Sequence, residues 1–330
     1  MLQLFWITQE QTLDISDYVQ SITWKGARGV APRSLEVRLM NTGRGWHQWL
    51  PIWEGHTLLC RWAGTELFRG TVFAQSKNRN FDQTIRVYDQ MIYMVKNVNA
   101  YVFTNQKASD IVKRVCGDFQ IPMGDIKDTG YRIPSLIVDG ESLYDIAYKG
   151  IYATFKQTGK RFCIGSSEGK IYLREKMDQR SYIVIEDGVN LIDFNWDTSI
   201  EDSATSVVMV AGEEKKAITI SAKNSTLAKE IGIIQHYEKV TDKVNAAQLR
   251  ERVHKTLAEK GKVMRKASLN CIGDETVIAG TAMHLIITDM EVFKGYYVDE
   301  DTHQFTGNSH TMSLILSETD DLPVVEIKTT

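Results

Sequence analysis

The sequence has little of what marks a secreted, membrane-spanning or metal-dependent protein. It contains only five prolines and four cysteines in 330 residues. No apolar run approaches the roughly 18 residues that a membrane helix needs. The first residues lack the basic segment of a signal peptide, so we expect synthesis and folding in the cytoplasm. The cysteines form no Cys-x-x-Cys pair, and we expect buried, small apolar side chains at Cys60, Cys116, Cys163 and Cys271.

Charge of either sign is also in no marked excess. The net charge is −3 and the pI is near 6.2, whereas a surface for nucleic acid would need a basic excess. A hydrophobic share of 43% with 25% charged residues is typical of a soluble globular protein. The length allows two or three domains.

Catalytic motifs are missing as well. The sequence contains no Gly-x-Gly-x-x-Gly, no Gly-x-Ser-x-Gly and no phosphate-binding loop. Asp128-Thr129-Gly130 matches the tripeptide of aspartic proteases, but that chemistry needs two carboxylates and the chain has no second copy. We therefore predict a turn there, with Gly130 supplying a permissive backbone.

One acidic segment could hold a cation. On a strand, Asp299, Asp301 and His303 would share one face, and carboxylates suit a hard ion. The alternative is a strand face that is solvated or paired with Lys or Arg, and no His-x-His or His-Glu-x-x-His pattern accompanies these residues. We predict no catalytic, cofactor-binding or metal-binding residue, and we expect a protein that is not an enzyme.

What the sequence does contain is a repeat. Glu66-Leu67-Phe68-Arg69-Gly70 returns as Glu291-Val292-Phe293-Lys294-Gly295. Gly55 and Gly280 precede the two phenylalanines at the same distance, and strand-like runs follow both copies in register. A second pair of segments, around Trp24 and Trp196, supports the duplication. The pattern predicts a duplicated unit, with Phe68 and Phe293 in matching core positions and Gly70 and Gly295 at matching turns or bulges.

Periodicity divides the chain into three domains. Residues 1–101 alternate with period two between glycine turns and predict a first β-barrel. Residues 102–188 predict a small helix–helix–hairpin domain, and residues 189–330 predict a second barrel with a helical insert near 246–260. The fold class is therefore α+β, mainly β.

The predicted elements have recognisable ends. A helix with an apolar stripe from Ala108 to Phe119 could be capped by Thr104 or Asn105, and a second helix from about Ser142 to Thr158 would end at Gly159. The last hairpin would turn at Gly307-Asn308. The tail after Glu318 is polar, and we expect it to be mobile.

A tryptophan-rich loop, Trp46 to Trp53, lies between two predicted strands. Aromatic side chains concentrate at interface cores, so the loop could contact a partner. It could equally fold over the open end of its own barrel.

Six short segments form an ordered set in the first half of the chain. They are Phe68–Phe73, Tyr88–Met94, Ala108–Val112, Asp128–Pro134, Asp139–Ile146 and Lys156–Lys160. This set resembles the XkdQ/YqbQ family of tail hub proteins from contractile phages, defective prophages and phage-tail-like bacteriocins. The similarity is densest from about residue 60 to 175, and the hairpin from Gly295 to Leu316 also fits.

The resemblance implies a structural baseplate hub without catalytic residues or cofactors. In such hubs each chain carries two related barrels, and a homotrimer closes a pseudo-six-fold ring between the hexameric tail tube and the trimeric spike. The implied partners are the chain itself, the tube protein and the central spike, then tape measure and LysM-type baseplate proteins, with no membrane and no specific nucleic acid. The implied location is the tail tip of a virion or injection particle. Two alternatives stay open: a cell-wall hydrolase or peptidase of the tail tip, and a hexameric tube-end or distal-tail protein.

Overall fold

A computed structural model describes residues 1–42, 48–80, 82–176, 183–212, 217–240 and 245–318. The predicted tail after Glu318 lies outside these residues. The chain divides into two compact units, one of residues 1–194 with 269–330 and one of residues 195–268. No helix in the described part is long and apolar enough to cross a membrane.

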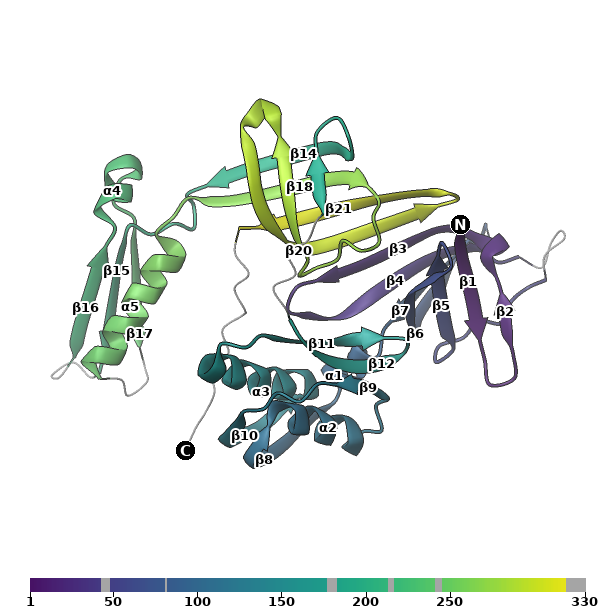
Figure 1. Cartoon of the computed structure of the whole chain (residues 1–330), viewed down its shortest axis with the longest axis horizontal. Coiled ribbons are helices and arrows are strands. Elements are labelled where there is room, and N and C mark those ends of the chain that lie inside the picture. Colours follow the sequence, from purple (N-terminus) through teal and green to yellow (C-terminus); the bar gives the residue numbers. More distant parts are fainter. Residues whose placement is uncertain (43–47, 81, 177–182, 213–216, 241–244, 319–330) are drawn as a thin grey trace. The chain divides into compact units, whose positions relative to one another are not determined.

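The first unit is built on one sheet to which both ends of the chain contribute (Figure 1). The strand order is β14-β18-β21-β20-β3-β4-β7-β6-β5-β1-β2, and β19 joins β13 to β20. The N-terminal strands are β1 (Leu2–Ile7), β2 (Thr12–Asp14), β3 (Val19–Ala27), β4 (Val30–Met40), β5 (Thr57–Trp62), β6 (Thr65–Lys77) and β7 (Asp82–Tyr88), with the short helix η1 (Ser16–Tyr18). The C-terminal strands are β13 (Val184–Glu186), β14 (Leu191–Ser199), β18 (Met264–Ile272), β19 (Ala282–Ile287), β20 (Val292–Thr306) and β21 (Ser309–Ser317), with η2 (Thr288–Met290). β14 and β18 run on into the second unit.

The two predicted barrel modules are not found as separate bodies. β20 pairs with β19 through its first residues and with β3 through its last ones, from Glu300 to Phe305. Its 15 residues are long enough for both pairings. Phe305 therefore packs into the N-terminal core with Ile22, Leu35 and Val37. The mainly β prediction is confirmed, but the strands form one continuous sheet and no closed barrel among the described residues.

The repeated segments do share local structure. Gly55 and Gly280 both have φ +91°, a left-handed conformation that favours glycine. The Gly55 N–H donates to Val72 O at 2.9 Å, and Val72 N–H donates to His56 O at 2.9 Å. Gly280 and Val298 form the same pair of bonds at 2.8 and 2.9 Å, the second with Thr281 O. The hairpins β5–β6 and β19–β20 therefore begin in the same way.

The predicted equivalence of Phe68 and Phe293 is wrong. Phe68 is 5% exposed, whereas Phe293 is 58% exposed. Phe68 pairs with Cys60 on β5, but the residue that matches Cys60 in the repeat, Leu285, pairs with Lys294. The second hairpin is thus offset by one residue, and a one-residue offset moves a side chain to the other face of a sheet.

Gly70 and Gly295 occupy neither turns nor bulges, contrary to the prediction. Both lie inside strands, Gly70 opposite Leu58 and Gly295 opposite His284. A Cβ atom at Gly70 would lie 2.3 Å from Tyr88 O. Glycine is needed there because the neighbouring backbone comes so close.

The middle of the chain has its own apolar core. Its elements are α1 (Met91–Lys96), β8 (Val98–Lys107), α2 (Ala108–Asp118), β9 (Met123–Ile126), β10 (Arg132–Ser142), α3 (Leu143–Thr158), β11 (Phe162–Ser167) and β12 (Lys170–Glu175). The buried side chains of α2 and α3 pack with those of the strands in one cluster. The predicted helix–helix–hairpin order is confirmed, and Gly159 ends α3 with φ +71°.

The pairing of β8 with β10 was not predicted from the sequence; β8 directly precedes α2, and β10 directly precedes α3. Thr104 and Asn105 lie in β8 and do not cap α2, because that helix begins after Lys107. The Lys107 backbone N–H donates to the Asp110 carboxylate at 3.3 Å. The predicted cap at Thr104 or Asn105 is therefore wrong, because these polar residues belong to the end of a strand.

The second unit is a small α/β body. It contains β15 (Ser206–Ala211), β16 (Ile218–Lys223), α4 (Ser225–Ile231), β17 (Gln235–Val240) and α5 (Ala246–Lys260). β15 lies between β16 and β17, and α5 contributes Leu249 and Val253 to the core. The predicted helix at 246–260 is confirmed.

Replacing Asn245 with alanine is expected to destabilise the second unit by about 1 kcal/mol. The Asn245 side chain accepts from the Gln248 N–H at 2.9 Å, and the Gln248 side chain accepts from the Asn245 N–H at 3.0 Å. Hydrogen exchange of the α5 amides would measure the change. Gln235→Ala, at an exposed position on β17, is the control. Equal protection of the α5 amides in the two variants would contradict the role of the cap.

Candidate interaction site

Two ion pairs join the N-terminal and C-terminal parts of the sheet. The Arg33 guanidinium on β4 donates to both carboxylate oxygens of Asp301 on β20, at 2.9 and 2.5 Å. Asp301 also accepts from Ala279 N–H at 2.6 Å, and its side chain is fully buried. Arg28, in the β3–β4 turn, pairs with Asp299. We call this cluster the joint.

The joint accounts for the three residues, Asp299, Asp301 and His303, that the sequence analysis considered as cation ligands. Asp299 and Asp301 are paired with arginines, and His303 bonds to Val277 and His310. In the described parts of the chain, no group of three or more His, Cys, Asp or Glu could hold a metal ion. The alternative interpretation, an acidic strand face paired with arginine, is the one observed.

A histidine pair extends the joint. His303 Nε2 lies 2.9 Å from the Val277 carbonyl, which can only accept, so Nε2 carries the proton. His303 Nδ1 then accepts from His310 Nε2 at 3.0 Å. Burial, and then the neighbouring His303, lowers the pKa of His310 to about 4. Both rings are therefore neutral near pH 7.

This pair predicts a loss of stability in mild acid. Between pH about 6.5 and about 4 the unfolded chain takes up a proton at His310 and the folded chain does not, so stability falls as the pH falls. Asp89 contributes in the opposite direction, because burial raises its pKa to about 7. The free energy of unfolding of wild type and His310→Gln, measured from pH 7 to 4, isolates the histidine. The variant should show the smaller loss in acid, and identical losses would contradict the prediction.

The tryptophan-rich loop combines the two alternatives from the sequence, a loop that covers its own core and a surface that contacts a partner. Trp46 and His47 lie outside the described residues. Leu50 and Ile52 are buried in the N-terminal core, as expected of a loop that covers it. Trp49 and Trp53 point outward, 47% and 51% exposed, as expected of a contact surface.

The loop is held in place by polar contacts. The Asn41 side chain is fully buried; its Nδ2 donates to Leu50 O and its Oδ1 accepts from Leu50 N–H, both at 2.9 Å. The two outward rings meet edge to face with centroids 5.9 Å apart. Rigid aromatic side chains lose little conformational entropy when a partner binds.

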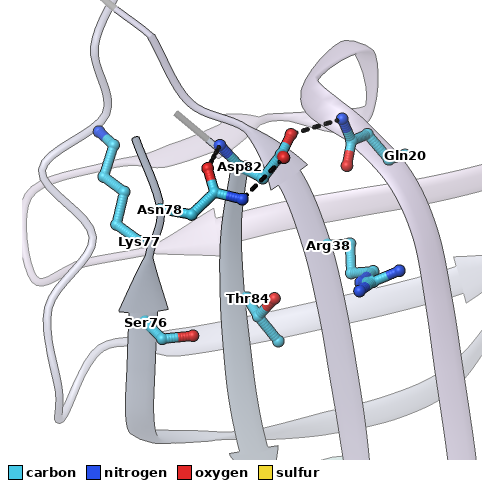
Figure 2. A pocket seen from close by; sticks show the side chains of 7 residues that line it. All are labelled: Gln20, Arg38, Ser76, Lys77, Asn78, Asp82 and Thr84. Carbon is cyan, nitrogen blue, oxygen red and sulfur yellow. Dashed lines mark hydrogen bonds between the residues drawn. The ribbon is translucent and has the colours of Figure 1, made fainter. Parts of the chain in front are cut away.

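A polar groove of about 310 Å³ lies on strands β3, β4, β6 and β7 (Figure 2). It is lined by Gln20, Arg38, Ser76, Lys77, Asn78, Asp82 and Thr84. Figure 2 shows Lys77 and Arg38 on opposite sides of Asp82 and Thr84. The Lys77 ammonium reaches to 6.0 Å from the centroid of the Trp49 ring. We call Trp49, Trp53, Lys77 and Arg38 the rim.

The single carboxylate of the groove is already satisfied. Asp82 accepts from Asn78 Nδ2 at 2.9 Å and from Gln20 Nε2 at 3.1 Å. The Asn78 bond, followed by the Gln20 bond, lowers the pKa of Asp82. The groove thus carries two cations, Lys77 and Arg38, and the Lys77 ammonium lies near the Trp49 ring.

The other residues considered from the sequence have structural roles. Gly130 has φ +74° and its N–H donates to Asp128 Oδ1 at 2.8 Å, which confirms the turn. Lys107 binds the second Asp128 oxygen at 2.6 Å. Three cysteines are buried as expected, but Cys163 on β11 is exposed.

Sequence reasoning missed Arg33, Arg38 and Lys77. Arg33 and Asp301 are separated by 268 positions, so spacing could not pair them. The signal available was charge. Residues 183–194 and 269–318 contain eleven Asp and Glu but only one basic residue, Lys294.

Proteins with a similar sequence or a similar structure are known. A sequence model described as YQBQ-like matches residues 22–317. XkdQ, a protein of the phage-like element PBSX of Bacillus subtilis strain 168, is 37% identical over 325 residues, covering 98% of this chain and 99% of XkdQ. The 43 kDa tail protein of prophage MuSo2 from Shewanella oneidensis has a similar structure, with TM-score 0.71, 14% identity and coverage of 96% and 98%. The E. coli c3393 protein, a component of the type VI secretion system with structural similarity to the T4 tail proteins gp27 and gp5, has TM-score 0.55, 9% identity and coverage of 92% and 74%.

Proposed function

Because this chain belongs to the YQBQ-like family, we propose that it is a non-enzymatic hub of a phage-like tail, a homotrimer that joins the tail tube to the central spike. The observation that carries the proposal is full-length similarity to a phage-element protein together with a fold shared with a phage tail protein. The place of action would be the baseplate of a virion or of a tail-like particle.

The repeat gives this proposal a physical basis. A chain with two hairpins that begin in the same way carries two related units, so three copies in a closed ring carry six. Such a ring can match a six-fold tube on one side and a three-fold spike on the other. In this proposal residues 1–101 and 189–330 alternate around the ring, and residues 102–188 form the domain between them.

The experiment is the mass of the purified full chain by analytical ultracentrifugation, with its symmetry by electron microscopy. We expect a trimer with six similar densities around its axis. A hexamer of the chain would favour a tube-end protein, and a monomer at about 100 µM would contradict the hub.

No arrangement among the described residues favours the cell-wall hydrolase. Asp128 and Asp301, two of the carboxylates that a hydrolase could use, are bound to Lys107 and Arg33. A peptidoglycan-release assay on the wild-type protein tests that alternative directly. Release that depends on either carboxylate would contradict a purely structural role.

A further inference from the structure

Charge is distributed unevenly between the two ends of the sheet. Residues 1–90 contain ten Lys and Arg against eight Asp and Glu. The C-terminal strands and their connections, residues 183–194 and 269–318, contain eleven acidic residues against one lysine. Within one copy these ends already attract each other, because both ion pairs of the joint combine an N-terminal arginine with a C-terminal aspartate.

The rim lies away from the joint. β3 and β4 are antiparallel neighbours; Arg28 lies in the turn between them and Arg33 lies near the start of β4. Gln20 and Arg38 of the groove lie at the opposite ends of the same two strands. The joint is satisfied within the chain, whereas the two tryptophans of the rim remain about half exposed.

A matching surface occurs in the C-terminal part of the sheet. The segment from Glu186 to Asp193 runs from the end of β13 into β14, the strand at one end of the sheet order. Val189 and Ile192 are 65% and 61% exposed, and the acidic side chains of Glu186, Asp187 and Asp193 are exposed beside them. Aliphatic side chains next to carboxylates complement aromatic rings next to cations.

We infer that the Glu186–Asp193 segment of one copy docks on the Trp49, Trp53, Lys77 and Arg38 rim of the next copy. The inference rests on the proposed ring and names its contact. Val189 and Ile192 pack against the two indoles, and the acidic residues face Lys77 and Arg38. The surfaces are unlike, so the contact is head to tail, and repetition either closes a ring or continues as a filament.

A second copy fits this surface better than an unrelated partner does. The chain itself carries the required combination of exposed aliphatic and acidic groups, in the C-terminal part of the same sheet. The proposed contact pairs N-terminal cations with C-terminal carboxylates, as the ion pairs of the joint do. In a head-to-tail arrangement, N-terminal cations would therefore pair with C-terminal carboxylates both within each copy and between copies.

The first test is a cross-link. In a Cys163→Ser background, Trp53→Cys and Ile192→Cys are combined and treated with a short bismaleimide. We expect dimers and then a closed trimer on a denaturing gel, and only monomer from either single variant. Phe293→Cys in place of Ile192→Cys is the matched control, since Phe293 is equally exposed on the C-terminal strands but lies outside the segment.

The second test is a charge exchange. Lys77→Glu, and separately Asp187→Lys with Asp193→Lys, are each expected to raise the concentration at half-assembly by about tenfold or more. All three substitutions in one chain should restore assembly. Lys170→Glu on β12 is a control for charge alone, and the melting temperature of each variant shows that it is folded.

The outcomes separate this inference from the proposed function. A wild-type trimer that survives both reversals and gives no cross-link overturns the contact and leaves the hub intact. A wild-type monomer at about 100 µM overturns the hub, and the contact with it. Loss of assembly in each reversal with recovery in the combined variant supports both.

Discussion

Replacing Asp301 with alanine is expected to lower the free energy of unfolding by about 3–5 kcal/mol. The side chain is fully buried and binds two guanidinium nitrogens of Arg33 and the Ala279 N–H. The substitution leaves the charge of Arg33 in a largely buried place without its partner and leaves the Ala279 N–H without its acceptor. Urea unfolding followed by circular dichroism measures the change.

Two controls show whether the pair or the position is responsible. Glu300→Ala changes an exposed acidic neighbour on the same strand and should cost less than about 0.5 kcal/mol. Arg33→Met with Asp301→Leu replaces both charges with apolar groups, which is often neutral for a buried pair. A loss below 1 kcal/mol in Asp301→Ala would show that the joint does not stabilise the sheet.

Replacing Gly70 with alanine is expected to cost about 3 kcal/mol, the upper end of the range for overpacking. The added Cβ would lie 2.3 Å from Tyr88 O and 2.7 Å from Phe68 Cε1. A backbone oxygen held in a sheet cannot rotate away, so β6 and β7 would have to separate. The melting temperature and the urea midpoint report the loss.

Gly295→Ala is the matched control that the repeat itself provides. Around Gly295 the nearest atom to an added Cβ is Met283 O, at 3.9 Å. We expect a change within about 0.5 kcal/mol. Equal losses at Gly70 and Gly295 would mean that the two hairpins are packed alike, contrary to the one-residue offset between them.

Elements with strong local signals could be predicted from the sequence. The apolar stripes of α2, α3 and α5 and the terminating Gly159 all depend on neighbouring residues. Helix periodicity is therefore sufficient to find them. The turn at Gly307-Asn308 belongs to the same group, since it needs only a local conformation.

Features that depend on distant residues could not be predicted. The repeat located both hairpins, but sequence similarity does not reveal the one-residue offset that exposes Phe293. The structure does not contain the two separate barrels that were predicted, because β20 pairs with β3. That pairing joins residues far apart in the sequence and is set by tertiary contacts. The tryptophans of the candidate site could be found in the loop sequence. The two cations of the groove come from β4 and β6, which the loop sequence does not contain.

The pairing of β20 with β3 has a consequence for the order of events during synthesis. β3 leaves the ribosome early, but its partner strand and Phe305, which completes the N-terminal core, come from residues 292–306. Until then the nascent chain carries an unpaired strand edge and an unfilled core, the features that make intermediates prone to wrong association. The sheet can therefore be completed only after residue 306 has been made, and a chaperone that shields strand edges would be most useful until then.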